Sequence, residues 1–135
     1  EWEIAARYPD GRLYPWGNEY REGHANVDEQ ADGVGQYSLG MSTAVGLYEV
    51  GRHPQLNLYD LTGNVWEWCF RYFPDIQEDK DSMNNIRGRV RGGSWCNNHI
   101  LAQSTTRDFY EVDPRFDCYG LRLCAAPQNS LEAYQ

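Results

Sequence analysis

Lysine is almost absent from this chain, which has one lysine, Lys80, beside eleven arginines, and twenty acidic residues against twelve basic ones. The formal charge of −8 leaves no basic surface to neutralise phosphates, so nucleic acid is not an expected partner. Long apolar runs are also lacking, because none approaches the roughly 18 residues of a membrane span. The chain starts without the basic and apolar blocks of a signal peptide. These absences predict a soluble protein without membrane insertion.

Metal-ligand spacings of cysteine and histidine are missing as well. The four cysteines, Cys69, Cys96, Cys118 and Cys124, form no CxxC pair. The three histidines, His24, His53 and His99, show no HxH or HxxxH spacing, so zinc or iron is not predicted and each is expected in an exposed loop. An even number of cysteines does not establish disulfides, and free thiols and disulfides both remain open.

The chain length and the residue pattern predict one small α+β domain. Its 135 residues suit a single domain, expected over residues 1–126 with a polar tail at 127–135. Residues 1–7 read as the last turns of a helix, and the Gly-rich stretch that follows, as far as Tyr59, shows no sustained period. Short strands are expected at 65–70, 87–95 and 120–126.

Aromatic residues are abundant, with five Trp, ten Tyr and four Phe. The strand-like segments GNVWEW and RVRGGSW are the two most apolar, so we expect Trp66, Trp68, Val90 and Trp95 to share one core. In the last expected strand, Leu121 and Leu123 fall on one face. Two adjacent glycines after Arg91 indicate a close approach of backbone segments.

Five segments occur in a fixed order: EWEIAAR at 1–7, YPWGNE at 14–19, NLYDLTGNVWEW at 57–68, RVRGGSW at 89–95 and GLR at 120–122. This series resembles the formylglycine-generating-enzyme, or sulfatase-modifying-factor, type of domain, a variant of the C-type lectin fold. The resemblance implies an α+β fold of short strands and long ordered loops. In the family a substantial N-terminal part precedes the helix expected at 1–7, so the resemblance implies either that this chain is a C-terminal fragment or that another segment completes the fold.

Catalysis is not implied, because the cysteine pair of the resembling oxidase would fall at Asn97 and Ala102. Cys96 is next to the first of these positions, but a side chain one residue away on a strand points to the opposite side. We therefore expect a protein that is not an enzyme. The alternative is a divergent domain of this family acting in an oxidoreductase or an accessory complex.

The stretch from RGGSW to GLR resembles the variable region of proteins diversified by retroelements. Arg107 and Arg115 stand twelve and twenty residues beyond Trp95, as in that branch, and with Arg122 are expected to brace loops through backbone carbonyls. The resemblance implies ligand binding by a diversified surface at about residues 96–119. Expected ligands are proteins or cell-surface molecules, and display on a virion or a cell is left open. The expected surface residues are Cys96, Asn97, Asn98, His99, Thr106, Asp108, Phe109, Tyr110, Glu111, Phe116, Asp117, Cys118 and Tyr119.

The physical pattern agrees with a binding surface. A loop expected between Arg107 and Gly120 carries four aromatic rings among acidic residues, without the apolar periodicity that would bury all four. Tyr and Phe among small polar groups give large contact area at low rotamer cost, as in antibody paratopes. The alternative is that about two of the four rings belong to the core.

Long loops also suggest a structural calcium ion, and two sites follow from the resemblance. The first uses Asp60, Gly63, Val65 and Glu67, whose carboxylates and carbonyls bracket a tight turn. An equal alternative is that Asp60 caps the turn while Glu67 pairs with an arginine. The second site, less well matched, uses Asn26, Val27 and Asp32. No other cofactor is expected.

Overall fold

The computed structural model describes residues 1–69, 87–111 and 116–125. A short helix, α1 (Trp2–Ala6), is followed by a long region of loops that contains one 3-10 turn, η1 (Glu49–Gly51). The strands are β1 (Trp66–Cys69), β2 (Arg87–Arg91), β3 (Asp108–Glu111) and β4 (Tyr119–Leu121). The predicted helix and the sparse regular structure up to Tyr59 are confirmed. Among the described residues, no helix is long and apolar enough to cross a membrane.

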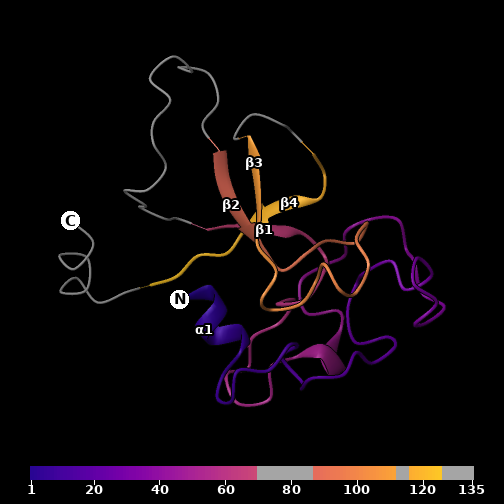
Figure 1. The fold of residues 1–135 in the computed structure, drawn as a ribbon, viewed down its shortest axis with the longest axis horizontal. Coiled ribbons are helices and arrows are strands. Elements are labelled where there is room, and N and C mark those ends of the chain that lie inside the picture. The colour runs from indigo at the N-terminus through magenta and orange to yellow at the C-terminus, as the bar shows by residue number, and fades with distance from the viewer. Residues whose placement is uncertain (70–86, 112–115, 126–135) are drawn as a thin grey trace.

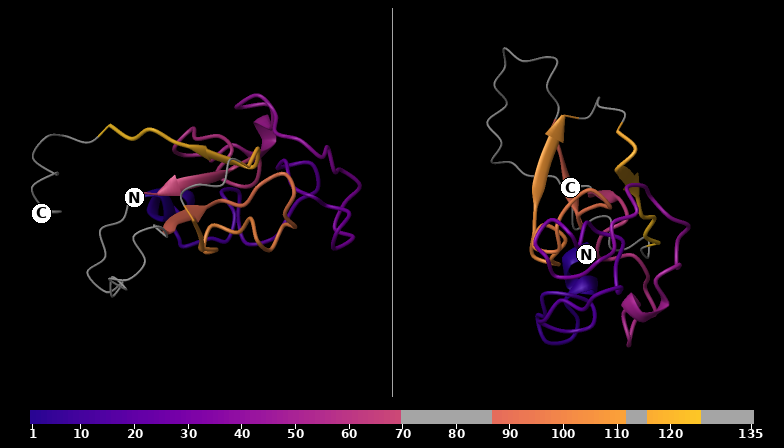
Figure 2. Two further views of the ribbon diagram at one scale, coloured as in Figure 1. Left: turned by 90° about the horizontal axis from the view of Figure 1, so that it is seen from above. Right: turned by 90° about the vertical axis from the view of Figure 1, so that its right-hand side faces the viewer.

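One four-stranded sheet, ordered β3-β2-β1-β4, organises the C-terminal half (Figure 1). β1 pairs antiparallel with β2 and parallel with β4, while β2 pairs antiparallel with β3. Apart from α1 and η1, the remainder of the described chain is loop, most of which extends away from the sheet on one side (Figure 2). β1 is a central strand, and the strands paired with it, β2 and β4, are both distant from it in sequence.

The strand boundaries differ from the expected ones. β2 ends at Arg91, because Gly92 and Gly93 adopt φ of +92° and +72°. A Cβ on Gly93 would lie 2.7 Å from the Cα of Ala102, so the expected close approach is confirmed. β4 stops at Leu121, and Leu121 and Leu123 are 69% and 89% exposed rather than facing a core. Residue 126 lies outside the described part.

Loops are held mainly by hydrogen bonds around the turn before β1. The Asn64 N–H donates to the Asn26 carbonyl (2.8 Å), and the Trp95 N–H donates to the Asn64 carbonyl (3.0 Å). The Asn64 Oδ1 accepts bonds from the Thr43 N–H and the Asn26 amide. The turn itself needs Gly63, whose φ is +74° and whose Cβ would overlap the Asn26 carbonyl. This turn therefore ties three distant loop segments to the sheet.

The core is divided rather than single. Trp66 and Val90 are buried, as expected, but Trp68 and Trp95 are only partly buried. A second cluster, which sequence reasoning did not separate, forms around Ala25, Val27 and Ala102, with Trp16 and Tyr20 packed against it. The expectation of one core shared by the two apolar segments is therefore only half right.

Candidate functional site

The strand register gives the sheet two different faces. Residues paired directly across neighbouring strands point to the same side. Trp66 of β1 is paired with Tyr119 of β4, while Trp68 and Tyr110 are paired with Val90 and Gly88, which lie two residues apart on β2. All these side chains therefore share one side. We call Trp68, Tyr110, Phe116 and Tyr119 the aromatic face; Phe116 is in no strand but contacts Tyr119. The end of this side at Phe116 is exposed and is called the open end, in contrast to the buried end at Trp66.

Tyr119 lies at the centre of the aromatic face. Its ring centroid is 5.4 Å from Trp68 in a stacked arrangement, 5.0 Å from Tyr110 nearly edge-on and 6.0 Å from Phe116. Phe116 is 57% exposed, whereas the other three rings are partly buried. Burial, followed by interactions within the tyrosine pair, raises the pKa of Tyr119, and burial is also the main cause of the raised pKa of Tyr110. Both hydroxyls are therefore neutral near pH 7.

Residues 108–111 form the edge strand β3 instead of the expected loop. Alternation along a strand sends Phe109 to the side opposite Tyr110, where the Arg89 guanidinium lies 4.7 Å from the Phe109 ring centroid. The prediction that Phe109 shares one surface with Tyr110 is therefore wrong. The side chain of Glu111 and the whole of Arg115 lie outside the described residues.

The polar positions after RGGSW hold a turn together. The Asn97 Oδ1 accepts bonds from the Ser94 N–H (3.1 Å) and hydroxyl (2.6 Å). The Asn98 Oδ1 accepts a bond from the backbone N–H three residues further on (3.0 Å), and the Thr106 hydroxyl donates to a backbone carbonyl (3.1 Å). These three residues are partly buried, so they belong at least in part to the framework of the predicted surface.

Two cysteines of the predicted surface lie together beside the aromatic face. Cys96 is exposed and Cys118 is partly buried, and their thiols are close enough to hydrogen bond. Burial, reinforced by Cys96 and Asp117, raises the pKa of Cys118 to about 11, so its thiol stays protonated at neutral pH. All four cysteines are unpaired.

The histidines are more buried than expected. His53 is fully buried, because its Nε2 bonds the Tyr8 carbonyl and its Nδ1 accepts from two backbone N–H groups. His24 and His99 are partly buried. The ring centroid of His99 lies 5.1 Å from that of Tyr20, which is not part of the aromatic face. His99 is therefore grouped with Tyr20 and not with the other residues of the predicted surface.

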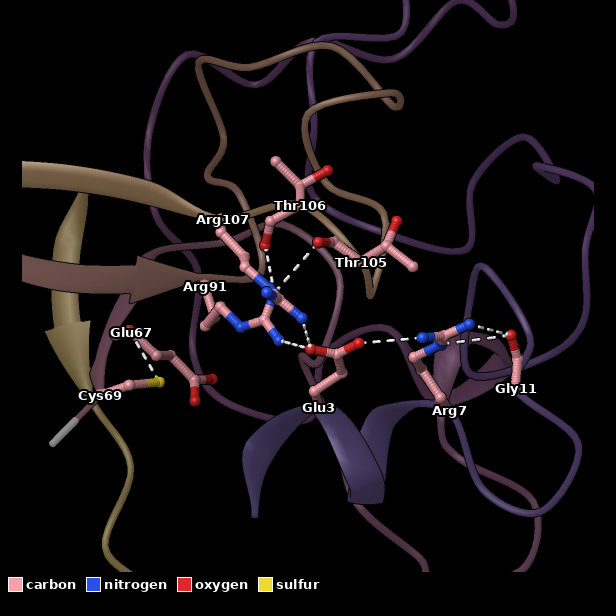
Figure 3. Close-up of polar contacts among 9 residues, drawn as sticks. All are labelled: Glu3, Arg7, Gly11, Glu67, Cys69, Arg91, Thr105, Thr106 and Arg107. Carbon is pink, nitrogen blue, oxygen red and sulfur yellow. Dashed lines mark hydrogen bonds and ion pairs between the residues drawn. The ribbon is translucent and has the colours of Figure 1, made fainter. Parts of the chain in front are cut away.

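The other side of the sheet is polar and is closed by α1 (Figure 3). The Glu3 carboxylate accepts bonds from Arg7 (2.9 Å), from Arg107 (2.8 Å) and from Arg91. Arg91 also donates to the carbonyls of Thr105 and Thr106. Burial disfavours the charged form of Glu3, but the three arginines outweigh burial and lower its pKa from 4.5 to about 2. Arg107 therefore braces a carboxylate instead of the expected carbonyls.

Glu67 is the second carboxylate on this polar side, and unlike Glu3 it is buried. Arg122 donates to both of its oxygens, at 2.8 and 2.5 Å, and the Trp2 indole donates to Oε2 at 2.8 Å. Arg122 also donates to the Tyr59 carbonyl (2.8 Å), which confirms its expected bracing role. Asp60 accepts a bond from the Gly46 N–H at 2.8 Å. The Glu67 contacts match the alternative in which Glu67 pairs with an arginine, whereas the Asp60 bond goes to Gly46, in a different loop from the turn that Asp60 was expected to cap.

A calcium ion at Asp60, Gly63, Val65 and Glu67 stays a prediction, and as the side chains lie Glu67 is already engaged by other groups. Calcium needs six to eight oxygens with free lone pairs, whereas N–H donors already face both Glu67 oxygens. Within residues 1–69, 87–111 and 116–125, no three His, Cys, Asp or Glu side chains are grouped as metal ligands.

The second predicted calcium site fits only in part. The Asn26 Oδ1 is buried and lacks a hydrogen-bond partner, which is compatible with a cation ligand. Val27 is buried, but Asp32 is exposed and its Oδ2 lies 3.3 Å from the His99 Nδ1. A structural calcium ion at these residues stays a prediction.

Trp68 and Gly88 contribute to the aromatic face and were not among the predicted site residues. A Cβ on Gly88 would overlap the Trp68 ring, so the glycine lets this indole lie across β2. The alternation in the sequence WEW indicates that Trp68 shares a side with Trp66. The register with β3 and β4, which brings the tyrosines to the same place, has no local sequence pattern.

The architecture matches solved structures of the formylglycine-generating-enzyme type of C-type-lectin-like fold. Treponema denticola variable protein 1 superposes with a TM-score of 0.57 at 20% identity, covering 90% of this chain and 43% of that chain. PvdO from Pseudomonas aeruginosa superposes with a TM-score of 0.61 at 25% identity, covering 89% of this chain and 48% of that chain.

Residues 1–127 match the sulfatase-modifying factor enzyme 1-like domain, and the chain belongs to this family. The inactive C-alpha-formylglycine-generating enzyme 2 of Bos taurus is 33% identical over 139 aligned positions, covering 93% of the chain and 42% of the relative. The formylglycine-generating enzyme of Streptomyces coelicolor is 30% identical, with 87% and 44% covered. The chain thus spans less than half the length of these relatives, which include both an active and an inactive enzyme by name.

Proposed function

We propose that this chain is a non-catalytic ligand-binding domain, with a sequence-diversified receptor surface on the lectin-type fold. The observation that carries the proposal is the contact of Tyr110, Phe116 and Tyr119 with one another and with Trp68. Three of these rings come from the stretch that resembles a diversified region, and they remain partly or largely exposed. Such a surface would act displayed on a virion or a cell, where it meets a protein or cell-surface ligand.

The separation of framework from surface supports the same proposal. Bonds from Trp2 to Glu67 and from Arg91 to Glu3 tie α1 to the sheet on the side opposite the aromatic face. Arg122 also bonds Glu67 there. Substitution of exposed aromatic-face residues leaves these bonds intact. A receptor that changes its binding residues needs this independence of fold and surface.

The second candidate is a divergent enzyme or an accessory domain, favoured by relatives that are named formylglycine-generating enzymes. Against turnover by the known chemistry, the two positions implied for the cysteine pair hold Asn97 and Ala102. Ala102 is fully buried against the Gly93 backbone, and the Asn97 amide is bound to Ser94. A thiol in either place would have to displace a packed contact.

The decisive experiment is a displayed library in which the open aromatic face and its margin are randomised together. We would randomise Cys96, Asp108, Tyr110, Phe116, Asp117 and Tyr119, and keep Asn97 and Asn98 because their side chains hold the turn. Soluble expression and binding to a panel of unrelated proteins would be scored. We expect most members to fold and different members to bind different targets.

A matched library would randomise six exposed loop positions: Glu19, Arg21, Ala31, Ser38, Ser42 and Gln55. This control should fold equally well and yield few binders. If the first library fails to fold while the control folds, the receptor proposal is wrong. Conversion of a peptide cysteine to formylglycine by the parent chain, lost in the first library, would favour the enzyme.

A further inference from the structure

The two sides of the sheet differ in what already occupies them. α1 lies against the polar side, where Trp2 bonds Glu67 and Glu3 bonds Arg91. On the opposite side, exposure of the aromatic groups increases from Trp66, which is 2% exposed, to Phe116, which is 57% exposed. Rings at this open end are packed on one another rather than enclosed.

Among the described residues, the charged groups assigned to the open end are the acidic Asp108 and Asp117. Asp108 shares the side of Tyr110 by register, and its negative charge contributes to the raised pKa of both tyrosines there. Asp117 is exposed and acts on Cys118. Arg107, the sequence neighbour of Asp108, donates to Glu3 on the other side, and Arg115, which precedes Phe116, lies outside the described residues. The whole chain carries a formal charge of −8, which also favours a basic partner.

We infer that the aromatic face binds a protein ligand through an exposed arginine or lysine side chain, held against the rings and beside Asp108 and Asp117. This inference rests on the proposed receptor function and adds the class of ligand to it. A cation is attracted to the negative face of an aromatic ring, and a neighbouring carboxylate adds a charge-assisted hydrogen bond. Both interactions are strengthened where the rings exclude water.

A neutral sugar fits this surface less well. Sugars also stack on aromatic rings and their hydroxyls can donate to carboxylates, but a neutral sugar brings no charge to balance two carboxylates, and Phe116 offers no hydrogen bond. A basic side chain uses every group present, since its methylene groups pack on Phe116 while its charge faces the aspartates.

Trp68 is the ring of the aromatic face that would stay the same in all members of a diversified set. It lies outside residues 96–119, and its position depends on Gly88, which cannot carry a Cβ without meeting the indole. Members with different residues at positions 110, 116 and 119 would therefore keep the same indole beneath the site. We expect preference for a basic side chain to persist among members that keep Asp108 and Asp117.

The test is a selection of a random dodecapeptide display library on the purified parent chain, beside a glycan array probed with the same protein. We expect selected peptides to be enriched in arginine and lysine. The double variant Asp108→Asn with Asp117→Asn should bind them about tenfold more weakly, as loss of close charge pairs implies. The matched control, Glu1→Gln with Glu19→Gln, removes two exposed carboxylates elsewhere and should bind as the parent does.

Selected peptides without a basic excess, no selected peptides at all, or equal weakening in both double variants would overturn the inference. So would binding of neutral glycans alone. If the double variant loses its fold by circular dichroism, Asp117→Asn alone serves, because Asp117 is exposed. The two proposals fail separately: a randomised library that yields diverse binders, with no basic preference in the peptides, would keep the receptor function and reject only the ligand class.

Discussion

The two sides of the sheet carry different kinds of interaction. On the side of α1, charged groups are paired: Glu3 with Arg91 and Arg107, and Glu67 with Arg122. On the other side, Trp66 is buried at one end and Phe116, whose ring contacts Tyr119, is exposed at the other. The contrast indicates that directional bonds join the segments of the fold on one side, whereas the other side offers contact area.

The two ends of the side that carries the aromatic face also differ in burial. Trp66 is buried and its N–H donates to the Cys118 carbonyl, so it belongs to the fold. Tyr119, paired with it across the sheet, is partly buried, so it contributes to both packing and surface. Substitutions should therefore cost less stability as the position moves toward Phe116.

The largest effect is expected from Trp66→Ala. Removing a buried indole loses its transfer free energy and leaves a cavity, at a cost of about 3 to 5 kcal/mol in the free energy of unfolding. Urea denaturation measures this cost. Phe116→Ala, at the open end of the same side, is the control and should change the stability by less than about 0.5 kcal/mol. Equal stability of Trp66→Ala and the parent would show that the core lies elsewhere.

A smaller loss is expected from Arg122→Gln. Glu67 is 4% exposed, so loss of the guanidinium leaves a nearly unpaired carboxylate in the interior, at a cost of about 3 kcal/mol. The double variant Arg122→Gln with Glu67→Gln should recover part of this stability, because no charge is then stranded. Thermal melting of all three proteins checks the order.

Calcium gives this prediction a second readout. If Arg122 supplies the cation at Glu67, a chelator should leave the melting temperature of the parent unchanged, apart from any ion at Asn26. A large drop with chelator that Arg122→Gln abolishes would mean that a metal ion and not the guanidinium neutralises Glu67.

Much of the fold could be predicted from local pattern, but less of the site. The segments WEWC and RGRVR read as strands because bulky residues alternate there, and the tight packing after Arg91 followed from paired glycines. β3 was missed because DFYE has no apolar alternation, and its pairing with β2 depends on contacts distant in sequence. The pairing of Glu67 with an arginine was one of two open alternatives.

Polar residues were the hardest to assign. Asn97 and Asn98 suit either a turn or a surface, and only the positions of Ser94 and Leu101 decide between them. His53 is buried because backbone groups satisfy both ring nitrogens, which no spacing of side chains reveals. When a side chain bonds to the backbone, its partner can be any residue type, so no sequence pattern identifies the contact.

The smallest effect is expected from Glu3→Gln, and its pH dependence identifies it. The pKa of Glu3 is lowered from 4.5 to about 2 in the folded chain, so ionised Glu3 favours the folded state. This contribution is complete above about pH 4.5 and is lost as the pH falls through 2, because the protonated carboxyl no longer attracts the arginines. At pH 7 the variant should be less stable by about 1.5 kcal/mol, the lower end of the range for hydrogen bonds to charged groups, because Glu3 is only partly buried. Near pH 2 its stability should approach that of the parent.

Urea titrations at several pH values test this, with Glu1→Gln as a control, since Glu1 makes no side-chain cap bond to α1. A difference between Glu3→Gln and the parent that stays constant from pH 7 to pH 2 would assign the loss to packing, and the arginine cluster would then not be what joins α1 to the sheet.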